Sequence, residues 1–193
     1  MVQLTEKKLD STELFQGKLL HAFRDTVELQ NGALATREYV VHPGAVMVVP
    51  LMVDSSGDLS LLMERQFRYP VNRVMIEFPA GKLDPGERSW HCARRELREE
   101  TGYSASFWAF AGTLHPVISY STEFIDIWFA KGLTLGEQAL DDGEFLDVFT
   151  ASPAQLLEWC RTGAVTDAKT MIAALWLQNV LSGAWTLDWK RDW

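Results

Sequence analysis

The chain has 193 residues, of which 47% are hydrophobic and 23% are charged, and it contains 8 Trp, 10 Phe and 4 Tyr. Aromatic and aliphatic side chains at this level are sufficient for a sizeable core, which excludes a largely disordered chain. The 18 Lys and Arg against 26 Asp and Glu give a net charge of −8, and nucleic-acid binding is not expected because it requires a clustered basic face.

The N-terminal segment and the two cysteines favour a cytoplasmic location. Residues 1–10 contain several charged side chains and no apolar run, unlike a secretory signal peptide. The longest apolar stretches fall far short of the ~20 residues that a membrane-spanning helix needs, so no membrane association is expected. Cys92 and Cys160 match no metal-binding spacing and are too few for a disulfide framework, so both are expected to be reduced and buried.

Residues 1–44 predict a small β-rich module. Residues 26–30 and 33–41 have a strand-like composition and flank Asn31-Gly32, a pair that favours a type I′ hairpin turn. The run His42-Pro43-Gly44 then marks a boundary. Because an isolated hairpin is only marginally stable, the module must pack on the main domain or on a second subunit.

Residues 45–193 predict one larger domain. Its strand candidates are residues 46–53, 59–64, 74–78, 107–114, 124–130 and 145–150, with a loop at 80–86. Its helix candidates are residues 88–101, 153–161 and 167–181. Strands followed by flanking helices favour a mixed sheet that is covered by helices.

The segment 88–101 is the strongest helix candidate. Trp90, Ala93 and Leu97 recur at helical spacing on one face, and Gly102 follows where a helix C-cap is expected. One face of this helix is therefore expected to be buried, while the other is available for a site.

Three glutamates crowd the second half of this helix. Glu96 and Glu100 are four residues apart and lie one above the other, with Glu99 beside them. Like charges at this spacing destabilise a helix by roughly 0.2–0.5 kcal/mol per pair, and the helix dipole disfavours anions near the C-terminus. One explanation is an ion-pair ladder with neighbouring arginines such as Arg95. The other is a hard divalent cation, Mg²⁺ or Mn²⁺, which prefers oxygen ligands.

The residues around this helix also match a known pattern. Gly81, Glu87 and residues 95–103 fill every fixed position of the Nudix box, which here spans residues 81–103. The chain therefore resembles a Nudix hydrolase. The resemblance implies an α/β (α+β) fold class, a Nudix-like α/β/α sandwich with a mixed sheet, to which the N-terminal module is added. It also implies metal-dependent hydrolysis of a diphosphate that is linked to another moiety.

The same resemblance implies roles for residues in and beside the box. Four residues would hold the metal, namely Ala80 through its carbonyl oxygen, Glu96, Glu99 and Glu100. Glu99 and Arg95 are also implied as catalytic residues. Arg95 and Glu87 would orient the metal-binding carboxylates.

The stretch 64–70, followed by residues 76–81, resembles the branch of the family that hydrolyses ADP-ribose and related nucleoside diphosphate sugars. This implies that Arg68 contacts a substrate phosphate or the terminal ribose, which suits its planar guanidinium. Glu77 would lie at the mouth of the same pocket and accept hydrogen bonds from ribose or adenine. The alternatives are a surface position for Arg68 and a salt bridge from Glu77 to Arg68 or Arg73.

Members of this branch often use a glutamate on a mobile loop as the general base. Residues 132–143 predict such a loop, and Glu144 matches the expected position best. Glu137 and Asp142 are the other candidates, and each of the three could instead be a solvated loop residue. A carboxylate there could close over the metal and deprotonate the attacking water.

The resemblance implies two substrate contacts at a distance from the box. Pro116, on the loop 114–123, would shape the terminal-ribose site, although Pro-Val replaces the usual Pro-Gly. In this branch the N-terminal hairpin is exchanged across a homodimer and helps to enclose the adenine. Since the N-terminal module contains no Trp, Arg37 is the candidate for stacking on the base.

The resulting expectation is a cytoplasmic, homodimeric enzyme that uses Mg²⁺ (or Mn²⁺) to hydrolyse ADP-ribose to AMP and ribose 5-phosphate. GDP-mannose, NADH and coenzyme A are alternative substrates within the same class. A non-catalytic nucleotide-sugar sensor is an alternative from another class, although such proteins usually carry a DNA-binding domain or an incomplete box.

Overall fold

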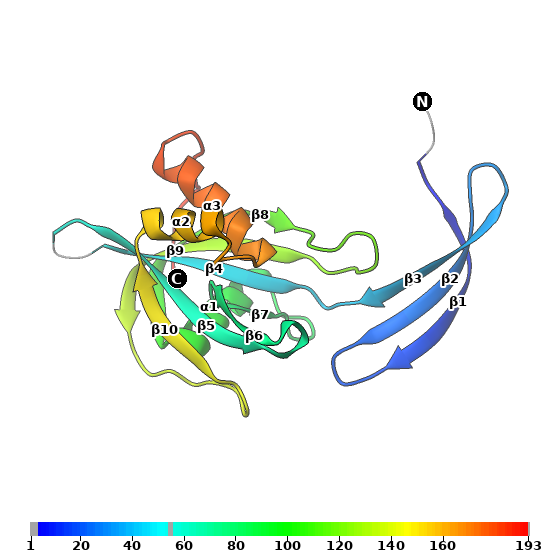
Figure 1. Cartoon of the computed structure of the whole chain (residues 1–193), viewed down its shortest axis with the longest axis horizontal. Helices are drawn as coiled ribbons and strands as arrows, with labels where there is room; N and C mark the ends of the chain where they lie inside the picture. Colours follow the sequence, from blue (N-terminus) through cyan, green and yellow to red (C-terminus); the bar gives the residue numbers. More distant parts are fainter. Residues whose placement is uncertain (1–3, 54–55, 193) are drawn as a thin grey trace. The chain divides into compact units, whose positions relative to one another are not determined.

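The computed structural model describes residues 4–53 and 56–192, which divide into two compact units. One unit contains the residues up to Gly44 together with His115–Phe124. The other contains Ala45–Leu114 and the chain from Ile125 onward. Figure 1 shows the strands and helices of each unit. Among the described residues, no helix is both long and apolar enough to cross a bilayer.

The second unit is built on a mixed β-sheet. Its strands are β4 (Ala45–Val53), β5 (Leu59–Arg68), β6 (Arg73–Glu77), β7 (Ala80–Lys82), β8 (Tyr103–Leu114), β9 (Ile125–Leu135), β10 (Leu146–Ala151) and β11 (Lys190–Arg191). Its helices are α1 (Ser89–Thr101), α2 (Pro153–Thr162) and α3 (Ala168–Leu181), and a 3₁₀ turn covers Tyr69–Val71. The strand order is β10-β5-β4-β9-β8-β11, with β6 paired to β5 and β7 paired to β4. Since β4 and β9 are parallel and the other pairs antiparallel, the predicted mixed sheet is confirmed.

The central strand β4 is buried on both faces over all but its last two residues. Because side chains alternate between the two faces of a strand, Val46 and Val48 pack with Leu97 of α1. Met47 and Val49 lie in the other core, which α2 and α3 cover. Figure 1 shows α2 and α3 on one side of the sheet and α1 on the other, which confirms the predicted α/β/α sandwich.

Helix α1 is fixed at both ends. The Nε1–H of Trp128 on β9 donates to the Ser89 hydroxyl at 2.7 Å, which ties the start of the helix to the sheet. At the other end, the Gly102 N–H donates to the Arg98 carbonyl at 2.8 Å and closes the helix where the sequence predicted a cap. The segment that carries the three glutamates is therefore held firmly against the sheet.

Several segments of this unit differ from the sequence prediction, since β5 runs on to Arg68 and β8 begins already at Tyr103. Residues 80–82 were expected to be loop, but they form β7 because they pair with β4. Strand β9 continues to Leu135 by pairing with β8, so the loop predicted at 132–143 begins later. The two-residue strand β11 was not predicted because it is too short and polar to give a strand pattern.

The first unit is a three-stranded antiparallel sheet of β1 (Lys7–Gln16), β2 (His21–Glu28) and β3 (Leu34–Val41). Strand β1 was not predicted, because its polar sequence lacks the apolar alternation of a half-buried strand. The β2–β3 hairpin is confirmed, but the predicted type I′ turn is wrong.

The turn of this hairpin is a three-residue loop. The Leu29 N–H donates to the Ala33 carbonyl at 2.8 Å, and the Gly32 N–H donates to the Leu29 carbonyl at 2.9 Å. Gly32 has a φ of 79°, whereas Asn31 lacks the positive φ that a type I′ turn requires. Glycine is thus needed at the last position of a three-residue loop, where φ is positive. The predicted turn would instead have placed Asn31 and Gly32 as its two central residues.

The segment His115–Phe124 joins the sheet of the first unit through backbone hydrogen bonds. The Val40 N–H donates to the Tyr120 carbonyl at 2.9 Å, and the Thr122 N–H donates to the Val40 carbonyl at 3.0 Å. Most of the predicted loop that carries Pro116 is therefore part of the first unit.

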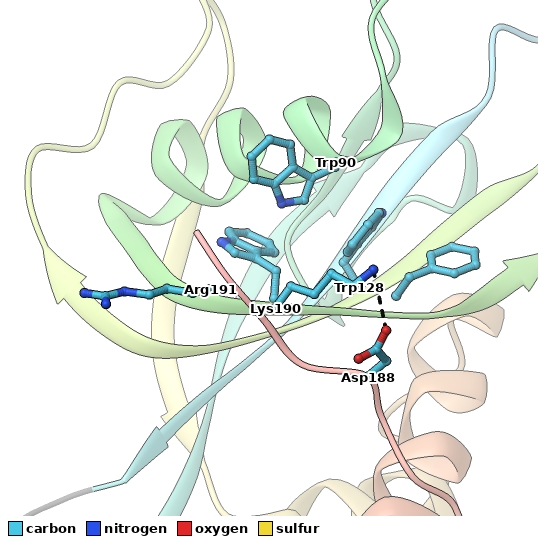
Figure 2. Close-up of a pocket in the computed structure, with 7 residues that line it drawn as sticks. Trp90, Trp128, Asp188, Lys190 and Arg191 are labelled. Carbon is cyan, nitrogen blue, oxygen red and sulfur yellow. Dashed lines mark ion pairs between the residues drawn. The ribbon is translucent and has the colours of Figure 1, made fainter. Parts of the chain in front are cut away.

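A cavity of about 340 Å³ lies between α1, β8, β9 and the C-terminal strand (Figure 2). Its lining residues are Trp90, Trp108, Phe110, Trp128, Asp188, Lys190 and Arg191. Figure 2 shows the Lys190 side chain reaching toward Asp188, with which it forms an ion pair at 3.5 Å. The glutamates of α1 are not among the lining residues, so this cavity is separate from the acidic face.

Candidate active site

Two of the three α1 glutamates are buried. Glu96 is 9% exposed and Glu100 is 3% exposed, while Glu99 is half-buried. Leu97, between them in sequence, is fully buried in the core under the helix. The helix therefore holds two carboxylates inside the protein, one turn apart, as the four-residue spacing predicted.

Strand β7 brings backbone against these carboxylates. A Cβ atom at Gly81 would lie 1.9 Å from the carboxyl carbon of Glu96 and 2.0 and 2.3 Å from its two oxygens, so only glycine leaves space for this side chain. The Ala80 N–H donates to Glu100 Oε2 at 2.9 Å. The close approach that the Gly-containing loop predicted is thus present, and Ala80 lies at the site through its backbone.

Arg95 lies between the carboxylates on the outer side of the helix. Its Nη1 donates to Glu96 Oε1 at 2.7 Å and to Glu99 Oε2 at 3.1 Å. Its Nε and Nη2 donate to the Glu87 carboxylate at 3.0 and 2.8 Å, and they lower the pKa of Glu87 to about 2. The ion-pair alternative is therefore realised for Glu96 and Glu99, whereas the Glu100 carboxylate accepts from a backbone N–H.

A fourth carboxylate, from Glu64 on β5, was not assigned a role from the sequence. Glu64 is 0% exposed, and neither of its oxygens has a hydrogen-bond partner among the described residues. It lies opposite Glu77 in the β5–β6 register, and its charge interacts with that of Glu100. The signal available in the sequence was a single carboxylate at the end of the apolar run 61–63.

Burial and mutual repulsion raise the pKa values of these carboxylates. Burial raises the pKa of Glu96 to about 7, and repulsion from Glu99 adds to the effect although Arg95 opposes it. Burial also raises the pKa of Glu64, with further repulsion from Glu77. The pKa of Glu100 is raised by burial and then by repulsion from Glu64 and Glu96. The cluster thus cannot be fully ionised near neutral pH unless positive charge is added.

Arg68 is engaged by Glu77 in a bidentate ion pair. Arg68 Nε lies 2.7 Å from Glu77 Oε1, and Arg68 Nη2 lies 2.9 Å from Oε2. Lys169 of α3 also binds Glu77 Oε2 and contacts Asp167 Oδ2 at 3.1 Å. Burial opposes ionisation of Glu77, but the bond from Arg68 and the charge of Lys169 hold its pKa below the ordinary value. The alternative of an Arg68–Glu77 salt bridge is therefore what the structure contains.

Two features of this ion-pair group differ from the sequence analysis. Arg73, the other proposed partner of Glu77, instead donates to Thr166. Lys169 was missed, because only the packing of α3 against the sheet brings it to a residue 92 positions away in the chain. The only indication of Lys169 in the sequence was a lysine near the start of the predicted helix 167–181.

Glu144 is the loop acid that faces the carboxylate cluster. Its Oε1 accepts from Gln66 Nε2 at 3.0 Å, and its charge is felt by Glu64, Glu96 and Glu100. The two other candidates for the base are exposed: Glu137 and Asp142.

Part of the loop between β9 and Glu144 is hydrogen-bonded to the end of α1. The Gly136 N–H donates to the Gly102 carbonyl at 2.7 Å, and the Ala139 N–H donates to the Glu99 carbonyl at 3.0 Å. Gln138 also donates to the Glu100 carbonyl through its side chain. Residues 136–139 are therefore anchored to the helix.

Arg37 and Pro116 belong to the first compact unit, whereas the carboxylates belong to the second. Arg37 donates to both carboxylate oxygens of Glu6, at 3.0 Å from Nε and 2.5 Å from Nη2. Pro116 begins the turn at the start of His115–Phe124. The role of these two residues at the substrate therefore remains a prediction.

The donor set of the cluster fits a hard divalent cation, which prefers oxygen ligands. Two observations support the fit: the unpartnered buried oxygens of Glu64 and the cradle at Gly81 that a Cβ would fill. Within the described residues, no three acidic, His or Cys side chains already form a closed cation site. Arg95 holds Glu96 and Glu99 through hydrogen bonds.

Two protein families match this chain, and the boundary between their matches lies close to the boundary between the two compact units. The NUDIX domain family matches residues 41–175, and the nucleoside diphosphate sugar hydrolase N-terminal domain matches residues 6–40. The ADP-ribose pyrophosphatase of Bacillus subtilis is 37% identical over 180 residues, which cover 92% of this chain and 95% of that protein. The methanol dehydrogenase activator of Bacillus methanolicus is 36% identical over 177 residues, with 90% and 92% coverage.

A solved structure gives the same fold. The crystal structure of an ADP compounds hydrolase superposes with a TM-score of 0.84 at 24% identity and covers 95% of this chain and 98% of that one.

The raised pKa values predict the pH dependence of stability in the presence of a chelator. A group with a raised folded-state pKa contributes stability below its ordinary pKa of 4.5, and the contribution is lost as the pH rises through the folded value, about 7 for Glu96. Because the pKa of Glu64 is also raised, to about 8, we expect the free energy of unfolding to fall between pH 5 and 8, by roughly 3 kcal/mol for a single group whose pKa rises from 4.5 to about 7. Urea denaturation at each pH measures it.

Glu100→Gln should flatten this dependence, because it removes one of the repelling carboxylates. Glu158→Gln on the exposed surface of α2 is the matched control and should leave the profile unchanged. A profile for the unaltered protein that is flat across this range would contradict the expectation.

Proposed function

The chain belongs to the Nudix hydrolase family, and we propose that it hydrolyses ADP-ribose to AMP and ribose 5-phosphate with Mg²⁺ (or Mn²⁺) as cofactor. The observation that carries this proposal is the buried carboxylate pair Glu96 and Glu100 under the glycine cradle at Gly81. The similarity to the ADP-ribose pyrophosphatase of Bacillus subtilis over almost the whole chain supports the choice of substrate.

The metal would be held by the carboxylates of the box. The proposed ligands are the carbonyl oxygen of Ala80 and the side chains of Glu96, Glu99 and Glu100. When bound, the cation would neutralise diphosphate charge and acidify a water molecule. Arg95, itself bound to Glu87, would act as a positioning residue that orients the carboxylates, since its guanidinium already contacts two of them.

Arg68 and Lys169 are the proposed contacts for substrate phosphate. Both cations now share one carboxylate, Glu77. If a substrate phosphate bound the guanidinium of Arg68, the Arg68–Glu77 ion pair would break. Lys169 would still neutralise Glu77, which lowers the free-energy cost of this exchange. Glu77 would then be free on one oxygen to accept a hydrogen bond from a ribose hydroxyl or adenine.

Glu144 is the proposed general base. In the hydrolysis, an oxygen of water forms a bond to a phosphorus of the diphosphate, the bridging P–O bond breaks, and the bridging oxygen leaves with the other phosphate. Glu144 would accept the proton of the attacking water. Gln66 would orient the Glu144 carboxylate, because the Gln66 amide donates to one of its oxygens and leaves the other oxygen available for the proton.

We propose that the first unit forms the interface of a cytoplasmic homodimer and helps to enclose the adenine, with Arg37 and Pro116 near the substrate. All residues of β1 are exposed, including Leu9 and Leu14, and Val27 is the sole buried hydrophobic residue of this unit among those described. A three-stranded sheet with so small a core needs a partner surface.

Hydrolysis of ADP-ribose tests the proposed reaction. With Mg²⁺, the purified protein should release AMP and ribose 5-phosphate, and Glu100→Gln should lower kcat/KM by roughly 100-fold or more because a metal-binding oxygen loses its charge. Chromatography of the products measures the rate, with Glu158→Gln as the matched surface control. GDP-mannose, NADH and coenzyme A, assayed in parallel, test the choice of substrate. Tight calorimetric binding of ADP-ribose without turnover would instead favour the sensor alternative.

The assignment of the base predicts a specific kinetic change. Glu144→Gln should lower kcat by roughly 10²–10⁴-fold while changing KM little, because proton transfer is lost and substrate contacts remain. Glu137→Gln, on the same loop, is the matched control and should retain activity. A larger loss in Glu137→Gln than in Glu144→Gln would reverse the assignment.

The proposed interface predicts the effect of a charge on β1. The full-length protein should elute as a dimer, and Leu14→Asp should shift it toward the monomer because the exposed apolar face would have to bury an unpaired carboxylate. Light scattering coupled to gel filtration measures the mass. A monomeric wild-type protein would contradict the proposed interface without bearing on the metal site.

A further inference from the structure

Among the described residues, Glu64 is an ionisable residue with unusual surroundings. It is completely buried in the interior of β5, and neither carboxylate oxygen has a hydrogen-bond partner among the described residues. Most buried polar side-chain atoms in proteins have such a partner. Leaving a carboxylate without one costs free energy that an aliphatic side chain at this position would avoid. The residue therefore calls for an explanation other than packing.

The side chain of Glu64 points to the α1 side of the sheet. Leu61 and Met63 of β5 lie in the core that α2 and α3 cover, so alternation along the strand directs Glu64 to the opposite face. Gln66 and Arg68 follow on the same face and contact Glu144 and Glu77. Glu64 thus begins a row of three polar side chains that faces the acidic site.

The cations nearby do not pair with Glu64. Arg68 and Lys169 both interact with it through their charges, but each donates its hydrogen bonds to Glu77. The other charged groups that interact with Glu64 are the carboxylates of Glu100 and Glu144, which repel it. The Glu64 carboxylate therefore has other carboxylates beside it and no hydrogen-bond donor from the described part of the protein. This is the arrangement expected of a cation ligand.

We propose that Glu64 is a ligand of the divalent cation, contributed by the β-sheet rather than by the helix that carries the box. The proposal rests on the metal site of the proposed function and adds to it a residue outside residues 81–103. The cation would then be bound from two sides, by Glu96 and Glu100 of α1 and by Glu64 of β5. Its charge would compensate for the burial of carboxylates that otherwise repel one another.

Direct measurement of metal binding tests this role. Mn²⁺ is titrated into the full-length protein, and the free ion is followed by electron paramagnetic resonance. Glu64→Gln keeps the shape of the side chain but removes its charge, so the affinity for Mn²⁺ should fall by roughly tenfold or more. Glu158→Gln should bind Mn²⁺ as the wild type does, and Glu100→Gln reports the loss of a ligand from the box.

A second variant separates a ligand from a structural group. If Glu64 is a ligand, Glu64→Leu should raise the Tm of the metal-free protein, because it removes an unpartnered buried carboxylate, and should abolish much of the rise in Tm that Mn²⁺ produces. If Glu64 is needed only for packing or for a shared proton, Glu64→Leu should lower the metal-free Tm and keep the metal-dependent rise. The second result would overturn the proposal.

The outcomes also distinguish this proposal from the proposed function. Tight Mn²⁺ binding by Glu64→Gln, together with weak binding by Glu100→Gln, would overturn the role of Glu64 and leave the metal site of the box intact. A wild-type protein that takes up no Mn²⁺ at millimolar concentration would overturn both.

Discussion

Repulsion between buried carboxylates is the constraint on which the rest of the site depends. Glu64, Glu96 and Glu100 lie within the protein with Glu144 near them, and burial disfavours the charged form of each. A fold selected for stability alone would not gather these groups, because neutral side chains of similar size would fill the same volume at lower cost. The interior is stable as an acid-rich region only when protons or cations compensate for the charge.

The surrounding structure holds this region together and neutralises only part of its negative charge. Glycine at position 81 lets strand β7 approach Glu96, and the bond from Trp128 to Ser89 fixes the start of α1 against the sheet. Arg95 pairs with Glu96 and Glu99, whereas the Glu100 carboxylate accepts from the Ala80 N–H. Glu100 therefore lies close enough to Glu64 of β5 for the two charges to repel one another. Rigidity of this kind favours catalysis, since ligands that are already positioned need no ordering when substrate arrives.

The sequence predicted those parts of the structure that depend on local patterns. Apolar spacing through Trp90 and Leu97 was sufficient for α1, and its four-residue glutamate spacing was sufficient for the acidic face. Contacts that depend on the assembled sheet were not accessible. Lys169 reaches Glu77 only because α3 packs against the sheet, and a lone carboxylate such as Glu64 in an apolar run does not reveal which face it occupies. The hairpin turn was mistaken for a similar reason, since Asn31-Gly32 is compatible with two loop lengths and the strand register decides between them.

The anchoring of residues 136–139 to α1 limits how Glu144 can move. Only the stretch 140–143 lies between that anchor and the glutamate, and β10 begins at Leu146 just beyond it. Because both ends of this short connection are held, Glu144 can move only a short distance. A wide opening of the candidate active site therefore cannot come from this loop. In the proposed reaction, a nucleotide-sized substrate would then enter and leave at another side of the carboxylate cluster, and Glu144 would move only a short distance toward the attacking water.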